Sequence, residues 1–479
     1  MGLKIFTIDQ SDLAISMHCR LDEKYSSFTR VDNWVIFDSQ FPQVQISNFL
    51  EALEIRKHKK GDLDEEMYLV NISDQSQRTG ELENVELVSE IGSDKNDLSE
   101  SDIFISKLGM PRGYVFLNSY KGKNLIGSTE FIPYKIKNFD SRLLLRYLLL
   151  HPKVLKAYSF LESGKTPSHR RVNPYEFLKI KLPAIPTLQQ QHIVSLIEPR
   201  DNRINELKSQ ITPPLRIINR VFAREFGFEE NLYNEFGKGM TAGTQIAQDK
   251  ILRVFDTTFD EFARSGIFRF STRFHNAPTK KLMDFLDNIK TLQVKDVVES
   301  FEKGLQPKYN SDGDIPVVKI ANLKNGFIDF SDPECVTEEY FKGIDERKKL
   351  KQNDIIICCT GKVSLGKIDF FDYEQESITT VDNYIVRLRD SYNMLFFTYF
   401  FRSILGYFQV ERDYTGATNQ IHLYWEEISN FKIPDIPLSI QQKIVDEIKG
   451  ELDRQEEIKK EIEKERKKIE EIIEELVYS

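Results

Sequence analysis

The chain has 479 residues, with 40% hydrophobic and 29% charged residues and a formal net charge of −9. This length exceeds what one hydrophobic core usually serves, and the composition is typical of soluble globular proteins, so we expect two or three domains. No apolar run approaches the roughly 20 residues of a membrane span and no cleavable signal opens the sequence, which predicts a cytoplasmic protein without a membrane partner. The net negative charge argues against a chain that coats nucleic acid over its whole surface, but it allows local basic grooves.

Cysteine spacing gives no sign of a redox or zinc motif. Cys19, Cys335, Cys358 and Cys359 include no Cys-x-x-Cys pair. Cys358 and Cys359 are adjacent in an apolar run, so in a strand they would point to opposite faces. We expect reduced thiols.

Residues 1–185 are predicted to form a mixed α/β unit. A helix is predicted around Ser141–Phe160, because Leu144, Leu148, Val154 and Leu155 fall on one helical stripe. Short apolar runs bounded by turn residues predict strands at Asn33–Phe37, Met67–Ile72, Asp102–Lys107, Tyr114–Leu117 and Glu130–Ile136.

One phrase occurs twice and divides the chain. Lys181–Val194 and Lys432–Val445 both contain Pro-x-Ile-Pro, then a glutamine pair, then Ile-Val at the start of a helix-forming run. Pro183 and Pro434 are 251 residues apart (434 − 183). A period this long indicates two similar domains rather than a solenoid, whose repeats are much shorter.

The phrase also predicts how each following helix begins. Pro-x-Ile-Pro is extended and cannot continue a helix. Thr187 and Ser439 are therefore predicted as N-caps, with Gln190 and Gln442 as their capping-box partners.

The helices predicted over residues 186–225 and 438–479 carry apolar residues at heptad spacing. Pro213 and Pro214 should break or kink the first helix, and Pro199 should disturb its start. Gln455 weakens a simple dimer seam in the second helix and suggests mixed helical partners. The predicted helix–helix and subunit contacts are Ile193, Ile197, Ile204, Leu207, Ile211 and Ile218, followed by Ile444, Ile448, Ile458, Ile462, Ile469, Ile472 and Leu476.

The second half repeats the order of the first after a connector at residues 226–290. Asn353–Ile357 matches Ser101–Ile105 at an offset of 252 (353 − 101), and Ile378–Leu388 matches Ile126–Ile136 at the same offset. A helix at about Met394–Val410 takes the place of the first helix. The second unit is predicted to start at Leu292–Val298, and the first unit shows no equally clear counterpart to its opening, Gly304–Pro307.

Two motifs resemble catalytic or phosphate-binding signatures, and neither fits. Gly361–Ile368 is one residue short of a phosphate-binding loop, because Ile368 stands where Ser or Thr must hold Mg²⁺ and its flank reads as strand. Asn173–Phe177 lacks the second proline of an adenine-methyltransferase signature and no glycine-rich cofactor loop precedes it. With no zinc-spaced cluster or hydrolase motif, the sequence predicts a non-enzyme with no catalytic, cofactor-binding or metal site.

The duplicated phrases, their helices and the two globular units resemble the specificity (S) subunit of type I restriction-modification systems. The resemblance covers essentially the whole chain. Its most telling parts are Ile180–Val194, Ile433–Val477, Gly304–Pro307, Ile315–Val318 and Asn353–Ile357.

The resemblance implies a mixed α/β fold with two similar target recognition domains separated by long helices that form an antiparallel coiled coil. The expected limits are 1–185 for the first recognition domain, 186–225 for a central helical spacer, 226–290 for a connector, 291–437 for the second recognition domain and 438–479 for the C-terminal helix. The long connector and the Pro213–Pro214 pair depart from the family pattern.

The family also implies partners and a target. Each recognition domain would read one half of a split double-stranded DNA site, and the helices would dock two modification (methyltransferase) subunits and, through them, restriction subunits. S-adenosylmethionine would be bound by the methyltransferase partner, with no cofactor in this chain. Helices of about 50 Å would hold the two domains one to one-and-a-half DNA turns apart, a turn being ~34 Å.

Sequence reading uses Arg, Lys, Asn and Gln at base edges, and Lys, Ser and Thr on phosphates. Arg170–Arg171 and Asn419–Gln420 are the strongest candidates, because they occupy equivalent places before the two phrases. The DNA-contact candidates are Lys107, Arg112, Lys165, Thr166, Ser168, His169, Arg170 and Arg171 in the first unit, and Lys308, Tyr309, Lys324, Asn325, Thr360, Lys362, Thr418, Asn419, Gln420 and His422 in the second.

Two other interpretations remain. A non-enzymatic scaffold could oligomerise through its coiled coil and bind proteins with its globular units, and sequence-specific DNA binding would separate it from a specificity subunit. An enzyme with its own methyltransferase or nuclease centre is disfavoured, because no cofactor loop or acidic metal cluster is present.

Overall fold

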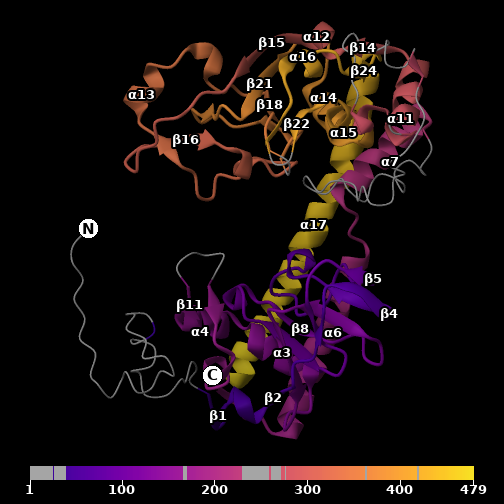
Figure 1. Cartoon of the computed structure of the whole chain (residues 1–479). Coiled ribbons are helices and arrows are strands. Elements are labelled where there is room, and N and C mark those ends of the chain that lie inside the picture. Colours follow the sequence, from indigo (N-terminus) through magenta and orange to yellow (C-terminus); the bar gives the residue numbers. More distant parts are fainter. Residues whose placement is uncertain are drawn as a thin grey trace. The chain divides into compact units, whose positions relative to one another are not determined.

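The computed structural model describes residues 25, 39–164, 170–228, 258–259, 271–275, 277–361, 364–417 and 420–478. The chain divides into two compact units, one made of residues 1–210 with 458–479 and the other of residues 211–457. Figure 1 shows the elements of each unit. The strand predicted at Asn33–Phe37 and most of the connector lie outside the described residues.

The first unit is centred on a four-stranded antiparallel sheet with the order β2-β10-β7-β8. All of β7 is buried, and Phe104 packs edge-on against Phe131 of β10 with ring centroids 5.0 Å apart. Three of the predicted strands are thereby confirmed. The bounds are Leu50–Ala52 for β2, Ile103–Ser106 for β7, Val115–Leu117 for β8 and Phe131–Ile136 for β10.

A second sheet of the first unit has the order β3-β6-β9-β4-β5, with β4 parallel to β9. The strand predicted at Met67–Ile72 belongs to the longer β4, and a 3-10 turn, η2 (Ile72–Asp74), follows it. The bounds are Lys57–His58 for β3, Gly61–Val70 for β4, Glu86–Ile91 for β5, Lys95–Asp97 for β6 and Leu125–Ser128 for β9.

The single helix predicted around Ser141–Phe160 is two helices, α3 (Arg142–Leu150) and α4 (Pro152–Leu161). Pro152 has no backbone N–H and restricts the residue before it, so the chain turns at His151 and a new helix begins. Ser141 caps α3 by accepting from the Leu144 N–H, and the His151 side chain caps α4.

Short elements complete the first unit, and one of them places the first phrase beside the first strand of the unit. β13, from the phrase itself, pairs antiparallel with β1, which opens the described unit. The remaining elements are β1 (Gln43–Gln45), η1 (Ile46–Asn48), η3 (Met110–Arg112), β11 (Glu162–Ser163), β12 (Arg171–Val172), α5 (Pro174–Phe177) and β13 (Lys181–Pro183).

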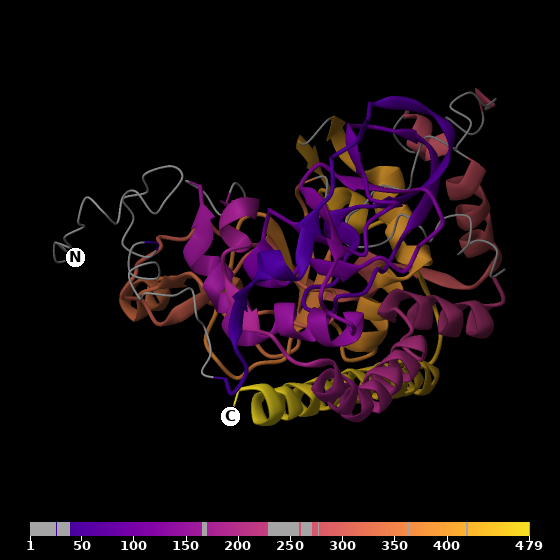
Figure 2. The same ribbon diagram turned by 90° about the horizontal axis from the view of Figure 1, so that it is seen from below.

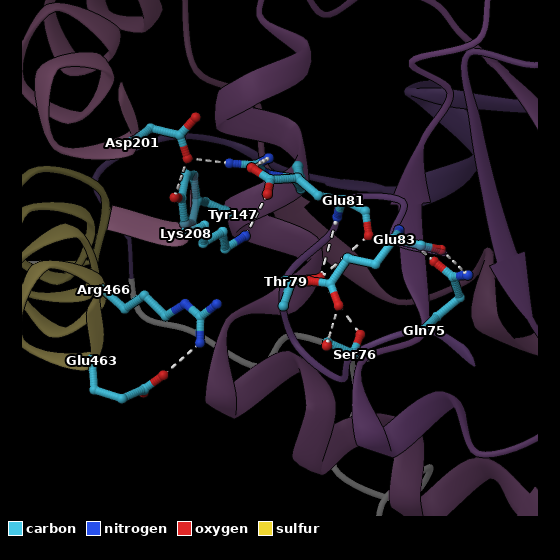
Figure 3. Close-up of polar contacts among 11 residues, drawn as sticks. Gln75, Ser76, Thr79, Glu81, Glu83, Tyr147, Asp201, Lys208, Glu463 and Arg466 are labelled. Carbon is cyan, nitrogen blue, oxygen red and sulfur yellow. Dashed lines mark hydrogen bonds and ion pairs between the residues drawn. The ribbon is translucent and has the colours of Figure 1, made fainter. Parts of the chain in front are cut away.

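A buried polar network joins the loop of residues 75–83 to helices of the same unit (Figure 3). Arg146 of α3 binds Glu81 at 3.1 Å and also pairs with Asp201, which accepts from the Tyr147 hydroxyl at 2.5 Å. Lys208 forms a second ion pair with Glu81. The loop passes so close that a Cβ on Gly80 would lie 2.3 Å from Arg146 Cδ, so only glycine fits there.

The second unit repeats the central sheet in the order β15-β21-β18-β19, and all of β18 is buried. Its second sheet, β17-β16-β20, keeps the parallel pair as β16 and β20. The bounds are Val298–Lys303 for β15, Ile315–Val318 for β16, Cys335–Val336 for β17, Asp354–Cys358 for β18, Ile368–Phe371 for β19, Ile378–Thr379 for β20 and Asn383–Leu388 for β21.

The helix predicted at Met394–Val410 is again two helices, α14 (Met394–Arg402) and α15 (Ile404–Asp413), which meet at Ser403. Phe396 and Phe400 of α14 pack against Phe222 with centroids 5.5 and 5.9 Å apart. The other elements are α10 (Thr272–His275), α11 (Ala277–Asn288), β14 (Thr291–Gln293), α12 (Val294–Val297), η7 (Ile320–Asn322), α13 (Glu338–Lys342), η8 (Glu346–Lys348), β22 (Thr415–Ala417), β23 (Gln420–His422), α16 (Trp425–Ile428) and β24 (Lys432–Pro434).

The first elements of the two units correspond to each other. β14 pairs antiparallel with β24, the strand of the second phrase, as β1 pairs with β13 in the first unit. A short helical turn follows each, η1 or α12, and then the edge strand of the central sheet, β2 or β15. Both units therefore share one plan from their first strand.

Three helices carry the heptad residues: α6 (Thr187–Ser209), α7 (Pro214–Phe226) and α17 (Leu438–Val477). The Pro213–Pro214 break is confirmed between α6 and α7, whereas α6 continues through Pro199. The predicted N-caps are wrong, because α6 already includes Thr187 and α17 already includes Ser439.

The glutamines of the phrase have a different role from the one predicted. Gln190 accepts from the backbone N–H groups of Asp140 and Ser141 at 3.1 and 3.2 Å, and its amide donates to Ile185 O at 2.8 Å. Gln441, not the predicted Gln442, does the same in the second unit, accepting from Asn393 N at 2.7 Å and donating to Ile436 O. Each glutamine thus ties the Pro-x-Ile-Pro segment to the start of α3 or α14.

Within each unit, the order of the ion pairs shows that α17 runs antiparallel to the helix beside it. Figure 2 shows magenta helices beside the yellow α17. In the first unit Arg200 pairs with Glu465 at 2.8 Å and Arg203 with Glu461 at 3.0 Å. In the second, α7 pairs with α17 through Arg220–Glu451 and through Arg224 and Glu447, whose closest atoms are 2.5 Å apart. Whether these helices pack as a regular coiled coil remains a prediction.

Most predicted seam residues are buried, but the end of α17 departs from the heptad register. Ile472 and Leu476 are half-buried, while their neighbours Ile473 and Val477 are buried. Ile211 is also half-buried, because it lies in the break after α6. The remaining predicted seam residues are buried: Ile193, Ile197, Ile204, Leu207, Ile218, Ile444, Ile448, Ile458, Ile462 and Ile469.

Gln455, predicted to weaken the seam, is buried and satisfied. Its side-chain oxygen accepts from the backbone N–H of Thr212 at 2.8 Å, beside the Pro213–Pro214 break where helical hydrogen bonds are lost.

Among the helices of the described residues, none is long and apolar enough to cross a membrane.

Candidate nucleic-acid interface

In the first unit, the hairpin of β11 and β12 rests on the chain that leaves buried strand β7. Ser163 pairs with Arg171 across the hairpin, and Arg171 in turn bridges Leu108. The Val172 N–H donates to Lys107 O at 3.0 Å, which fixes the height of the hairpin above the sheet. Two predicted DNA contacts, Lys107 and Arg171, are thereby brought together.

An acidic residue that the sequence analysis did not select completes this site. Glu130 accepts from Arg171 Nε at 3.0 Å to each carboxylate oxygen and from Nη2 at 2.8 Å. Lys107 Nζ lies 3.8 Å from the same carboxylate, and the Lys107 N–H donates to Glu130 O at 3.0 Å. The hydrogen bonds from Arg171 are the main reason that the pKa of Glu130 lies below its usual range, so the carboxylate is ionised at neutral pH.

The second unit has the same arrangement at the hairpin of β22 and β23. Thr360 bridges His422, and the Leu423 N–H donates to Cys359 O at 3.0 Å. The Cys359 N–H donates to Asp382 O at 2.8 Å, and the Thr360 hydroxyl donates to Asp382 Oδ1 at 3.0 Å. The His422 ring stacks on Tyr424 with centroids 6.0 Å apart.

These contacts correspond one by one in the two units. The pairs Lys107 and Cys359, Leu108 and Thr360, and Glu130 and Asp382 are each 252 residues apart, while Arg171 and His422 are 251 apart. Glu130 immediately precedes β10, and Asp382 immediately precedes the matching strand β21. A residue-by-residue alignment of the two halves therefore places an acidic residue at both positions. The duplicated site therefore has the same backbone and different side chains.

Part of the second half of the chain is similar to a known protein family. Residues 287–468, from α11 into α17, match the model of the family described as "Type I restriction modification DNA specificity domain". These residues are therefore similar to a type I restriction-modification DNA specificity domain. The description of the family names DNA specificity as the function of the matched domain.

Three solved structures match this chain over most of its length at low similarity. The S subunit of a type I system from M. genitalium is 14% identical, with a TM-score of 0.38, over 92% of this chain and 97% of that chain. The HsdS subunit from Thermoanaerobacter tengcongensis is 13% identical, with a TM-score of 0.31 and the same coverage of both chains. A type I system described in a study of complex assembly is 14% identical, with a TM-score of 0.37, over 91% of this chain and 97% of that chain. No curated protein sequence matches.

Asn325, a predicted DNA contact, lies in a turn. It has a left-handed φ of 56°, and its N–H donates to Asp369 Oδ2 at 2.9 Å. Asp369 is fully buried and paired with Arg402, whose burial lowers the pKa of the guanidinium. Lys324, beside it, is exposed and lies 3.7 Å from Asp329.

The other predicted contacts are spread over both units. Arg112 is exposed in η3, between two glycines of left-handed φ, and Arg170 is exposed at the edge of the hairpin. Lys308 lies 5.9 Å from the Tyr340 ring, and the 44% exposed Tyr309 lies 6.0 Å from Lys319 Nζ. Lys165, Thr166, Ser168, His169, Lys362, Thr418, Asn419 and the side chain of Gln420 lie outside the described part, and every DNA contact remains a prediction.

The thiols of Cys358 and Cys359 are buried and unreactive. Burial is the main cause that raises the pKa of Cys358 to about 12 and that of Cys359 to about 11, so both thiols stay protonated at neutral pH. Within the described residues, no group of three or more His, Cys, Asp or Glu side chains is arranged to hold a metal ion.

Proposed function

We propose that this specificity protein recognises a bipartite target in double-stranded DNA, with each unit reading one half. The observation that carries the proposal is the duplicated site. The match to the family model includes residues 287–457 of the second unit, and the first unit repeats the central sheet order and the hairpin contacts of those residues. A protein with two copies of one DNA-reading module is suited to two separated half-sites.

The helices are the proposed docking surface for two methyltransferase subunits, and through them for restriction subunits. α17 buries an apolar stripe and exposes a dense mixture of Glu and Lys on its other faces, which suits charged contacts with a partner. S-adenosylmethionine and methyl transfer belong, in this proposal, to the methyltransferase partner. The intact assembly would work in the cytoplasm.

The direct test is co-expression with the methyltransferase subunit of a type I system from the same genome, followed by mapping of methylated adenines. We expect a split methylated sequence that disappears when this chain is deleted. A stable complex without methylation would limit the chain to a non-modifying assembly. No association and no sequence-specific DNA binding would favour the alternative, a non-enzymatic coiled-coil interaction scaffold.

The division of labour between units predicts half-site-specific defects. Replacing Arg170 and Arg171 with alanine should relax recognition of one half by about tenfold, because each lost base contact removes about 1–3 kcal/mol of discrimination. The matched pair Thr360→Ala with His422→Ala should relax only the other half. The measurement is methylation of DNA libraries in which one half-site at a time is randomised.

Equal loss on unrelated DNA sequences in either double variant would instead identify phosphate contacts. Loss of both halves from one variant would contradict the assignment of one half to each unit.

A further inference from the structure

We propose that Glu130 sets the sequence discrimination of the first unit by holding Arg171 as a pre-oriented donor for a guanine edge. This inference rests on the proposed function. It adds Glu130 as a positioning residue for Arg171, the proposed base-contacting residue. It also assigns a class of base to one half-site.

The first step is the geometry of the pair. Glu130 binds Arg171 through Nε and Nη2, so one edge of the planar guanidinium is fixed against a carboxylate. The Glu130 side chain is only 18% exposed, whereas that of Arg171 is 41% exposed. An arginine held in this way presents a side chain of fixed direction to solvent, which suits the paired O6 and N7 acceptors of guanine in the major groove.

The second step concerns charge. An ionised carboxylate beside a DNA-contact arginine repels phosphate, so Glu130 lowers affinity for the DNA backbone. Its position between Arg171 and Lys107 offsets both cations at once, which suppresses sequence-independent binding. Specificity gains from such an arrangement, because specificity is the difference between correct and incorrect binding.

The third step is the comparison with the second unit. Asp382 occupies the equivalent position but binds the hydroxyl of Thr360, and His422 stands in the place of Arg171. The same acidic position therefore orients a permanently charged donor in one unit and a neutral hydroxyl in the other. We infer that the first unit reads a G·C pair at this position, whereas the second unit presents the Thr360 hydroxyl there.

The test is Glu130→Gln in the full chain assembled with its methyltransferase subunit. Binding to the methylated target sequence and to unrelated DNA would be measured over a range of salt concentrations. We expect the ratio of specific to non-specific affinity to fall by about tenfold. We also expect the logarithmic salt dependence on unrelated DNA to steepen by about 0.9 for each cation released to phosphate.

Asp382→Asn is the matched control, and it should leave the salt dependence unchanged because the described partner of Asp382 is a hydroxyl. Glu130→Asp keeps the charge and should restore part of the lost discrimination. A Glu130→Gln variant that melts at a lower temperature but keeps the wild-type affinity ratio and salt dependence would overturn the inference. Absence of any sequence preference in the wild-type assembly would instead overturn the proposed function itself.

Discussion

Replacing Arg146 with methionine is expected to destabilise the first unit by about 3–5 kcal/mol, because it leaves a buried carboxylate without its cation. Arg146 is 3% exposed and pairs with both Glu81 and Asp201. Glu81 would keep Lys208, but Asp201 would keep only the Tyr147 hydroxyl among the partners seen in Figure 3. The measurement is denaturant-induced unfolding of the full chain, monitored with a spectroscopic probe placed in the first unit.

Arg203→Met provides the control for this prediction. Arg203 pairs with Glu461 on the surface of the same unit, where both side chains are nearly half-exposed, and its loss should change stability little. Adding Asp201→Leu to Arg146→Met should restore part of the lost stability, because it removes the uncompensated charge. An Arg146→Met protein as stable as the wild type would show that the network is not a buried ion-pair system.

The network also explains a difference between the two units. In the first, charged groups join α3 to α6. In the second, α14 meets α7 through the rings of Phe222, Phe396 and Phe400, and Asn219 accepts the N–H of Ile404 at 2.8 Å. One plan is therefore held together by different chemistry, which is why similarity between the halves is clear in topology and weak in sequence.

The duplication is predictable from the sequence because the repeated residues restrict the backbone or form specific hydrogen bonds. Pro183 and Pro434 mark the same extended strand, and Gln190 and Gln441 bind the same helix start. Such positions combine a restricted backbone with a specific hydrogen bond, so they are visible as a repeated phrase. The predicted role of the glutamines as capping-box partners is wrong. A capping box is local in sequence, whereas these hydrogen bonds reach 49 or 48 residues back along the chain.

The acidic half of the candidate site could not be selected from residue types alone. Glu130 and Asp382 are common residues at strand starts, and their importance arises from Arg171 and Thr360, which are distant in sequence. Basic and amide side chains are the types that suit DNA contacts, which predicts Arg171 but not the carboxylate that binds it. Only the pairing of the hairpin with the chain after β7 brings the two together.

The end of α17 offers the second large effect, through two adjacent isoleucines. Ile473→Glu is expected to destabilise the first unit by about 3–5 kcal/mol, because Ile473 is 1% exposed and glutamate would lose its hydration there. Ile472→Glu should cost far less, since Ile472 is half-buried and its new carboxylate can reach water. Thermal unfolding of both variants gives the comparison.

The pair separates the helix register in the structure from the register of the heptad pattern, which places Ile472 and Leu476 in the seam. A strict 3.5-residue repeat drifts around the surface of a straight helix, which has 3.6 residues per turn. Toward the end of a long helix that does not supercoil, the buried positions are therefore the residues next to the heptad positions. Ile473 and Val477, four residues apart, fit that straight geometry. Greater loss from Ile472→Glu than from Ile473→Glu would restore the heptad seam, and with it the regular coiled coil, at this end of the helix.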